Sequence, residues 1–164
     1  MNAGTAVKIA LVIFVALFCH APGAPLAQSE LTRRETVRAG PATLQVTIRG
    51  KGEPIVFIPS RGRSVNDFDA LSNRLEQAGY QVVLPEPRGI GGSAGPLKNI
   101  TYHDLESDVA ATIESLVGRP ATILGHDFGN RIARTLASDY PRLVKQLILL
   151  SAGGMVPRSP RWKS

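Results

Sequence analysis

The sequence contains a single cysteine and few aromatic side chains. Because Cys19 is alone among 164 residues, the chain has no internal disulfide and no metal site built from several thiolates. Aromatic residues make up only 5%, and the 19 Lys and Arg, which outnumber the 13 Asp and Glu, are scattered along the sequence. This pattern argues against a nucleic-acid partner, since such a surface gathers its basic residues. With 43% apolar and 20% charged residues, the composition indicates one globular domain.

Residues 1–27 are predicted to be a signal peptide. Residues 1–8 carry one lysine and no acid, and residues 9–19 form an unbroken apolar run, IALVIFVALFC. This run suits a signal-peptide core and is too short for a membrane-spanning helix, which needs about 20 residues. Residues 20–27 are rich in small residues and proline, as a cleavage region is, while an uncleaved signal anchor is the alternative. We therefore expect a secreted or periplasmic protein with no membrane span after cleavage.

Strand and helix signals alternate along the rest of the chain. Apolar residues recur every three or four positions after Val65, after Thr101 and after Asn130, which predicts three amphipathic helices. Six extended segments are predicted, the last four as nearly continuous apolar runs: residues 35–38, 43–48, 55–58, 81–84, 121–124 and 147–150. Such strands alternating with helices predict an α/β fold, a mostly parallel, doubly wound sheet with helices on both faces. Ligands then bind at the carboxyl ends of the strands.

One acidic side chain lies where a predicted strand runs directly into a predicted helix. In ATILGHDFGNRIARTLA, Asp127 is at the tip of the turn, and Gly125 and Gly129 flank it two residues away on either side. This is the spacing of a G-x-S-x-G nucleophile elbow with Asp in place of Ser, in which small neighbours let the strand and the helix approach closely. The helix N-terminus also favours an anion there. An ordinary helix N-cap is the alternative, and the flanking glycines favour the nucleophile.

Three segments of the chain match loops of one enzyme family. They are IVFIPSRGR at 55–63, similar to a strand and its oxyanion loop; PEPRGIGGS at 85–93, similar to a D-x-R-G-x-G-x-S loop; and the elbow GHDFGNR at 125–131. In this order and spacing, residues 35–154 resemble the α/β-hydrolase fold. The resemblance is to the branch with an aspartate nucleophile, which includes epoxide hydrolases and dehalogenases.

The resemblance implies a reaction and a set of site residues. Asp127 would attack an sp3 carbon of a small-molecule substrate and form an alkyl-enzyme ester, which a water activated by histidine then cleaves. The backbone N–H groups of Arg61 and Phe128 would form the oxyanion hole, and Arg131 would hold a substrate anion. No cofactor and no metal is implied.

The sequence departs from the family pattern in its two substrate-facing loops. Pro59 and Ser60 replace the usual His-Gly of the oxyanion loop. Phe128 stands where dehalogenases commonly have a tryptophan that donates to halide, and a phenyl ring has no donor, which counts against haloalkane dehalogenation. Epoxide hydrolases polarise the oxirane with cap-domain tyrosines, whereas all three tyrosines here are expected at the boundaries of core elements: Tyr80, Tyr102 and Tyr140.

The cap, the acid-bearing strand and the histidine loop of the family are not recognised in this sequence. Residues 155–164 form a basic tail, and residues 28–154 are predicted to be a partial α/β-hydrolase domain. His103 is expected within a helix-capping segment and His126 in core packing, so we expect an exported hydrolase whose turnover is impaired. The exposed last strand favours self-association. Two other functions stay open: a non-catalytic binding module that retains the hydrolase half-sheet, and an esterase-type hydrolase.

Overall fold

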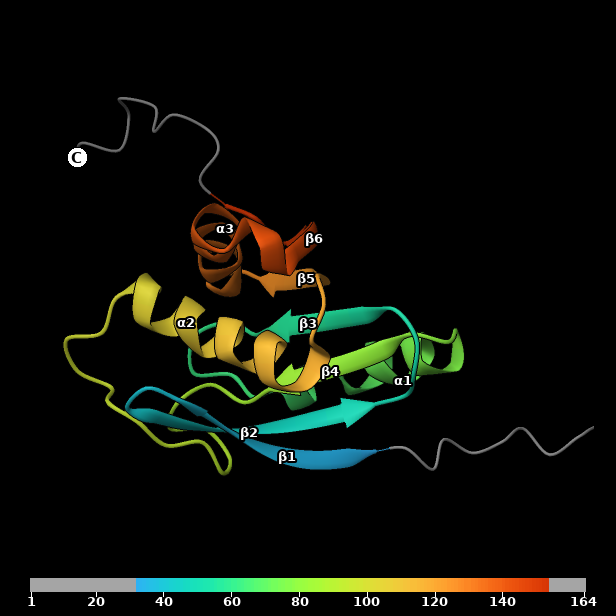
Figure 1. The fold of residues 1–164 in the computed structure, drawn as a ribbon, viewed down its shortest axis with the longest axis horizontal. Coiled ribbons are helices and arrows are strands. Elements are labelled where there is room, and N and C mark those ends of the chain that lie inside the picture. Colours follow the sequence, from blue (N-terminus) through green and yellow to red (C-terminus); the bar gives the residue numbers. More distant parts are fainter. Residues whose placement is uncertain (1–31, 154–164) are drawn as a thin grey trace, which may run out of the picture.

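The computed structural model describes residues 32–153, so the predicted signal peptide and the basic tail lie outside the described residues (Figure 1). All six predicted strands are present: β1 (Arg33–Ala39), β2 (Ala42–Arg49), β3 (Pro54–Ile58), β4 (Gln81–Pro85), β5 (Ala121–His126) and β6 (Val144–Leu150). The three predicted helices are α1 (Asp69–Gln77), α2 (Tyr102–Thr112) and α3 (Gly129–Asp139). Short helical segments lie beside them: η1 (Val65–Phe68), η2 (Ile113–Val117) and η3 (Pro141–Leu143). Among residues 32–153, none of the helices has the length and apolar character needed to span a bilayer.

The six strands form one mixed sheet in the order β1-β2-β4-β3-β5-β6. β1 and β2 pair as an antiparallel hairpin, and β2 pairs antiparallel with β4. The remaining neighbours, β4 with β3, β3 with β5 and β5 with β6, are all parallel. From β3 the chain moves outward to β4 on one side and then returns to β5 on the other. The carboxyl ends of β3 and β5 therefore lie at the point where the strand order reverses, which is where ligands bind in open α/β sheets.

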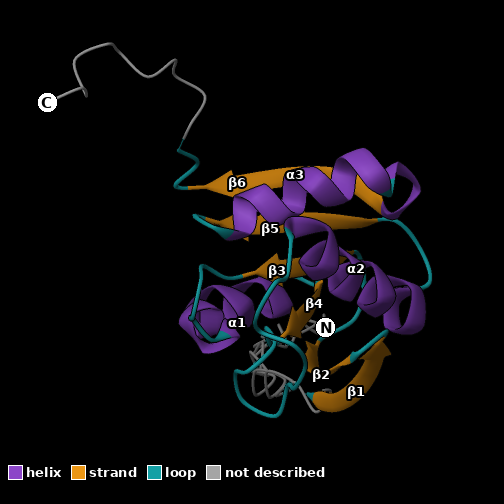
Figure 2. Ribbon diagram, turned by 90° about the vertical axis from the view of Figure 1, so that its left-hand side faces the viewer, coloured by secondary structure: helices purple, strands orange, loops and turns teal. Residues whose placement is uncertain are grey.

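Helices cover both faces of the sheet, as the continuous apolar strands predict (Figure 2). Successive residues of a strand point to opposite faces. Thus Val56 and Ile58 of β3 pack in the cluster formed with α2 and α3, whereas Phe57 packs in the cluster formed with η1 and α1. The ring of Phe57 lies 5.0 Å from the ring of Phe68, measured between centroids. At the edge, β6 is mostly half-buried or exposed, and Leu150 has 37% of its surface exposed.

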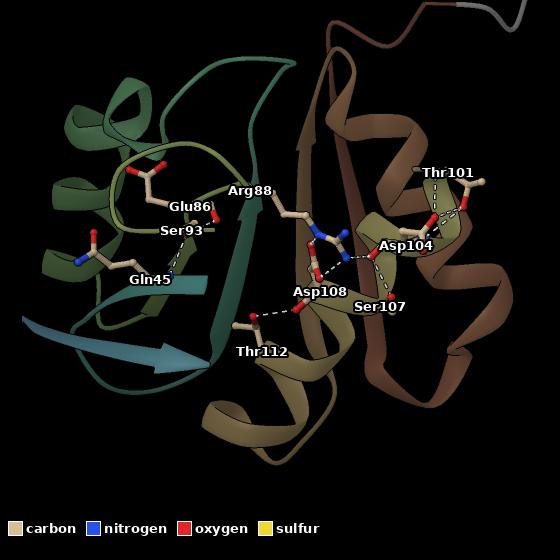
Figure 3. A network of polar contacts seen from close by, with 9 residues as sticks. All are labelled: Gln45, Glu86, Arg88, Ser93, Thr101, Asp104, Ser107, Asp108 and Thr112. Atoms are coloured by element: carbon tan, nitrogen blue, oxygen red, sulfur yellow. Dashed lines mark hydrogen bonds and ion pairs between the residues drawn. The ribbon is translucent and has the colours of Figure 1, made fainter. Parts of the chain in front are cut away.

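A buried ion pair joins the loop after β4 to α2 (Figure 3). Arg88 donates from Nε to Asp108 Oδ2 at 2.7 Å and from Nη2 to Asp108 Oδ1 at 2.9 Å. The same Nη2 also donates to the carbonyl oxygen of Asp104 at 3.2 Å. The side chains of Arg88 and Asp108 are only 3% and 7% exposed, so the pair fixes the loop against the helix in a water-poor environment.

The other end of this loop is held by Ser93, which Figure 3 shows beside the end of β4. Its hydroxyl donates to the carbonyl oxygen of Glu86 and accepts from the backbone N–H of Gln45, at 2.8 and 2.9 Å. Ser93 is also 6% exposed. Because its hydroxyl is hydrogen-bonded on both sides to the backbone, Ser93 holds the loop in place and is not available as a nucleophile.

Candidate active site

Asp127 lies in a strained turn between β5 and α3. Its φ of 49° is in the left-handed region, where a non-glycine residue costs about 1–3 kcal/mol and which often marks functional sites. Its carbonyl oxygen accepts from the N–H of Asn130, and its own N–H donates to the carbonyl oxygen of Leu150 at 3.0 Å. The side-chain amide of Asn130 donates to that same carbonyl oxygen at 2.7 Å. The turn is therefore fixed both to the helix that follows and to the end of β6.

The helix-cap alternative for Asp127 does not fit this turn. An N-cap residue has extended backbone angles and accepts from the helix N–H groups through its side chain. The N-cap position of α3 is Phe128, which has helical backbone angles and no capping side chain. The conformation of Asp127 is instead that of an elbow, which presents a side chain above the sheet.

Two glycines allow the strand, the turn and the helix to meet at the backbone. A Cβ atom on Gly129 would overlap the carbonyl oxygen of Ile58 and lie 2.8 Å from that of Pro59. A Cβ atom on Gly125 would lie 2.8 Å from the carbonyl oxygen of Gly129. Real Cβ atoms do not approach backbone so closely, so larger residues would push α3 away from the ends of β3 and β5. The predicted reason for both glycines is confirmed.

The carboxylate of Asp127 is exposed and held by Ser60 from the loop after β3. Ser60 Oγ donates to Asp127 Oδ2 at 2.6 Å. This hydrogen bond is the main cause that lowers the pKa of Asp127, and the N–H of Phe128 and the charges of His126 and Arg131 also lower it, against a smaller effect of burial. The carboxylate is therefore ionised at neutral pH, as a nucleophile must be.

The contact with Ser60 was missed by sequence reasoning, which noted only an unusual residue in the oxyanion loop. The structure supplies the reason in the strand register. Ile58 of β3 pairs with Gly125 of β5, and Ser60 and Asp127 each lie two residues beyond that pair. Equal offsets at the carboxyl ends of adjacent parallel strands bring the two side chains together. Had the register been known, this spacing would have identified Ser60.

The two residues expected to form the oxyanion hole lie together on the wall of a cavity of about 900 Å³. The guanidinium carbon of Arg61 lies 4.5 Å from the centroid of the Phe128 ring. Ser60 lines the same cavity and donates to the carboxylate of Asp127, which itself lies just outside the lining. Most of the exposed lining is apolar, with contributions from Leu44, Leu97, Leu105, Val109 and Ile132. Such a surface suits a small apolar substrate.

Tyr102 also lies on the cavity wall, where sequence reasoning placed no functional tyrosine. Its ring packs on that of Phe128 at 5.4 Å between centroids, and its hydroxyl accepts from Arg131 Nη1 at 2.9 Å. The same hydrogen bond raises the pKa of Arg131. Arg131, the expected anion-holding residue, is exposed and lies outside the cavity lining. The structure therefore places a phenol, rather than this guanidinium, on the wall beside the elbow.

The two histidines of the described residues contact other groups than Asp127. His126 lies edge-on to Phe68 with 6.2 Å between ring centroids, in line with its expected packing role. His103 lies in the first turn of α2, whose capping box between Thr101 and Asp104 is formed in both directions. Its Nδ1 is hydrogen-bonded to carboxylates of α2 and α3 rather than to the elbow.

Comparisons with known proteins agree with this fold. The sequence profile of the α/β hydrolase fold matches residues 53–163. A putative non-heme bromoperoxidase, BpoC of Mycobacterium tuberculosis, is 32% identical over 111 residues, which are 67% of this chain and 42% of that protein. Human protein ABHD8 is 28% identical over 112 residues, 67% of this chain and 26% of its own length.

Solved structures of similar fold also cover most of this chain. The epoxide hydrolase VrEH1 of Vigna radiata superposes with a TM-score of 0.70 at 26% identity, covering 79% of this chain and 42% of its own. Epoxide hydrolase A of Mycobacterium thermoresistibile has the same TM-score at 25% identity, covering 79% of this chain and 42% of its own. The chain thus spans less than half the length of these relatives. From the matched profile, the sheet order and the elbow, we conclude that this chain belongs to the α/β hydrolase fold family.

Proposed function

We propose that the chain carries the nucleophile of an exported hydrolase that opens small epoxides through Asp127. The observation that supports this most strongly is the Asp127 carboxylate itself, ionised, exposed and held by Ser60 at the edge of an apolar cavity. The two structural neighbours described above are epoxide hydrolases, and the family resemblance gives the reaction. The export part of the proposal is supported by the apolar run of residues 9–19.

In the first step, a carboxylate oxygen of Asp127 forms a bond to one ring carbon of the epoxide while the bond from that carbon to the ring oxygen breaks. The ring oxygen leaves as an alkoxide and takes a proton from water. The product is a hydroxyalkyl ester on Asp127. The short hydrogen bond from Ser60 orients the carboxylate for this attack.

In the second step, water attacks the carbonyl carbon of the ester, and the negative charge develops on the carbonyl oxygen. The bond from that carbon to the ester oxygen then breaks, and the diol leaves with one proton of the attacking water. The other proton returns to the hydroxide left when water protonated the alkoxide, and Asp127 is again a carboxylate. The N–H of Phe128 contributes to the lowered pKa of Asp127, and the N–H of Arg61 follows Ser60 in the neighbouring loop. These donors would stabilise the oxyanion. We propose that this step is slow in the chain, because His103 is hydrogen-bonded to Glu106 and Asp139 and His126 packs against Phe68.

Intact-protein mass spectrometry after incubation with styrene oxide tests the proposal. We expect one covalent adduct per chain, mapped by peptide digestion to Asp127, with release far slower than formation. Asp127→Asn should remove the adduct, and Asp67→Asn, which changes an exposed carboxylate paired with Arg63, should retain it. Absence of any adduct, or an equal adduct in Asp127→Asn, would refute the proposal. Tight binding of styrene oxide without an adduct would instead favour the non-catalytic binding module.

A further inference from the structure

Three side chains of ligand type meet where the first turn of α2 lies beside the end of α3. His103 and Glu106 come from α2, and Asp139 is the last residue of α3. His103 Nδ1 lies 3.0 Å from Glu106 Oε1 and 2.8 Å from Asp139 Oδ2. One ligand atom from each of the three residues lies within 4.8 Å of the others.

The cluster has too few hydrogen-bond donors to satisfy all of its carboxylate oxygens. Nδ1 of a histidine carries at most one hydrogen, so His103 donates to only one of the two carboxylates at a time. Glu106 is 2% exposed, and its Oε2 has no hydrogen-bond partner within the described residues. Its carboxyl group is aimed into the cluster, because Oε1 contacts His103. A buried carboxylate oxygen without a hydrogen-bond partner is costly. The arrangement therefore favours a cation that several ligand atoms can bind at once.

We propose that His103, Glu106 and Asp139 bind a divalent transition-metal ion of the zinc type. Tetrahedral zinc with bonds of about 2.0–2.2 Å separates neighbouring ligand atoms by about 3.4 Å. The two contacts of His103, at 2.8 and 3.0 Å, need to widen by a few tenths of an ångström to reach this spacing, and the carboxylate ligand atoms of Glu106 and Asp139 lie within 4.8 Å of each other. The His103 side chain is 69% exposed, which leaves a fourth position for water. One imidazole with two carboxylates suits zinc better than magnesium, which prefers oxygen ligands in octahedral geometry.

The bound ion links α2 to α3 and acts on structure rather than on the reaction at Asp127. The two helices contribute residues 36 positions apart, so the ion closes a long segment that includes β5 and the elbow. Because Nδ1 must be free of its proton to bind the metal, binding releases a proton whenever His103 is protonated beforehand. The site thus adds metal-dependent stability to a fold whose sheet edge at β6 is only partly covered.

Calorimetric titration of zinc chloride into the full chain, first freed of metal with a chelator, tests the site. Cys19 and His20 are also ligand types, so the informative quantity is the difference between variants rather than total bound zinc. His103→Ala and Asp139→Asn should each weaken the site at least about tenfold. Asp67→Asn, the matched exposed carboxylate, should leave it unchanged.

Thermal unfolding gives an independent readout on the same proteins. Zinc should raise the Tm of the wild type and of Asp67→Asn, with no rise in the two site variants and none with magnesium in any of them. A visible absorption band of bound cobalt should appear and then disappear with the same variants. The proposal is overturned if the wild type binds no zinc, or if His103→Ala and Asp139→Asn retain both the affinity and the rise in Tm. Either outcome is separate from the adduct experiment, because none of these residues contacts Asp127.

Discussion

Replacing Asp108 by leucine tests how much the buried ion pair contributes to stability. The substitution removes the two hydrogen bonds of 2.7 and 2.9 Å that satisfy Arg88, leaving its guanidinium with the Asp104 carbonyl oxygen at 3.2 Å. Arginine keeps its charge in proteins, and this side chain is 3% exposed. An unpaired charge of this kind costs about 3–5 kcal/mol of the free energy of unfolding, a large part of the stability of a domain.

The reciprocal substitution, Arg88→Met, should lower the free energy of unfolding by less than Asp108→Leu does, and the size of its effect should depend on pH. Burial already raises the pKa of Asp108 above its ordinary value, although Arg88 opposes this, so removing Arg88 raises that pKa further. A carboxyl group whose folded pKa lies above its unfolded pKa loses stability as pH rises through the folded value. Arg88→Met should therefore be more stable near pH 5 than near pH 8. Asp108→Leu should lack this dependence, since the titrating group is gone.

Urea unfolding followed by circular dichroism at both pH values measures these differences. The double variant Arg88→Met with Asp108→Leu should unfold within about 2 kcal/mol of the wild type, because no charge is left buried. Leucine at the exposed Asp67 is the control and should shift the midpoint little. The reasoning is refuted if Asp108→Leu costs under about 1 kcal/mol, or if the double variant is as unstable as the sum of the single ones.

Three further predictions concern the elbow and α2. Ser60→Ala should raise the pKa of Asp127 and move the acid limb of the pH profile for adduct formation to higher pH; an unchanged profile would show that the hydrogen bond does not tune the carboxylate. Gly129→Ala should lower the free energy of unfolding by about 1–3 kcal/mol through overlap with backbone, while Gly153→Ala, in open space, should not; equal urea midpoints would contradict the close approach. Thr101→Ala should cost about 1 kcal/mol by opening the capping box of α2, measured by urea unfolding, and Thr101→Ser should retain it.

Local patterns in the sequence predicted the elements of the fold because each pattern depends on near neighbours. The apolar run of residues 55–58 is buried on both faces, and the capping pattern at Thr101 starts a helix as expected. Strand order is different, since it depends on pairings between distant segments. The insertion of β4 between β2 and β3 is not visible in any single stretch of the chain.

The residues of the candidate site likewise fall into those that a local motif identifies and those that only distant pairings bring together. Asp127 was recognised because its glycines are two residues away, within one local motif. Its partner Ser60 is 67 residues away and meets it only through the register of β3 on β5. Tyr102 likewise reaches the cavity wall only because α2 packs beside α3. Sequence reasoning therefore identified the proposed nucleophile and two residues of the cavity wall, Arg61 and Phe128, and missed Ser60 and Tyr102.

The carbonyl oxygen of Leu150 accepts from both the amide of Asp127 and the side chain of Asn130. One acceptor atom at the end of β6 thus anchors the elbow from two directions. The amide of Asp127 can exchange its hydrogen with solvent only when this anchor is released, so its exchange rate measures how firmly the last strand is docked. A shift of β6 would therefore move the backbone of Asp127 as well, because both depend on where that one oxygen lies.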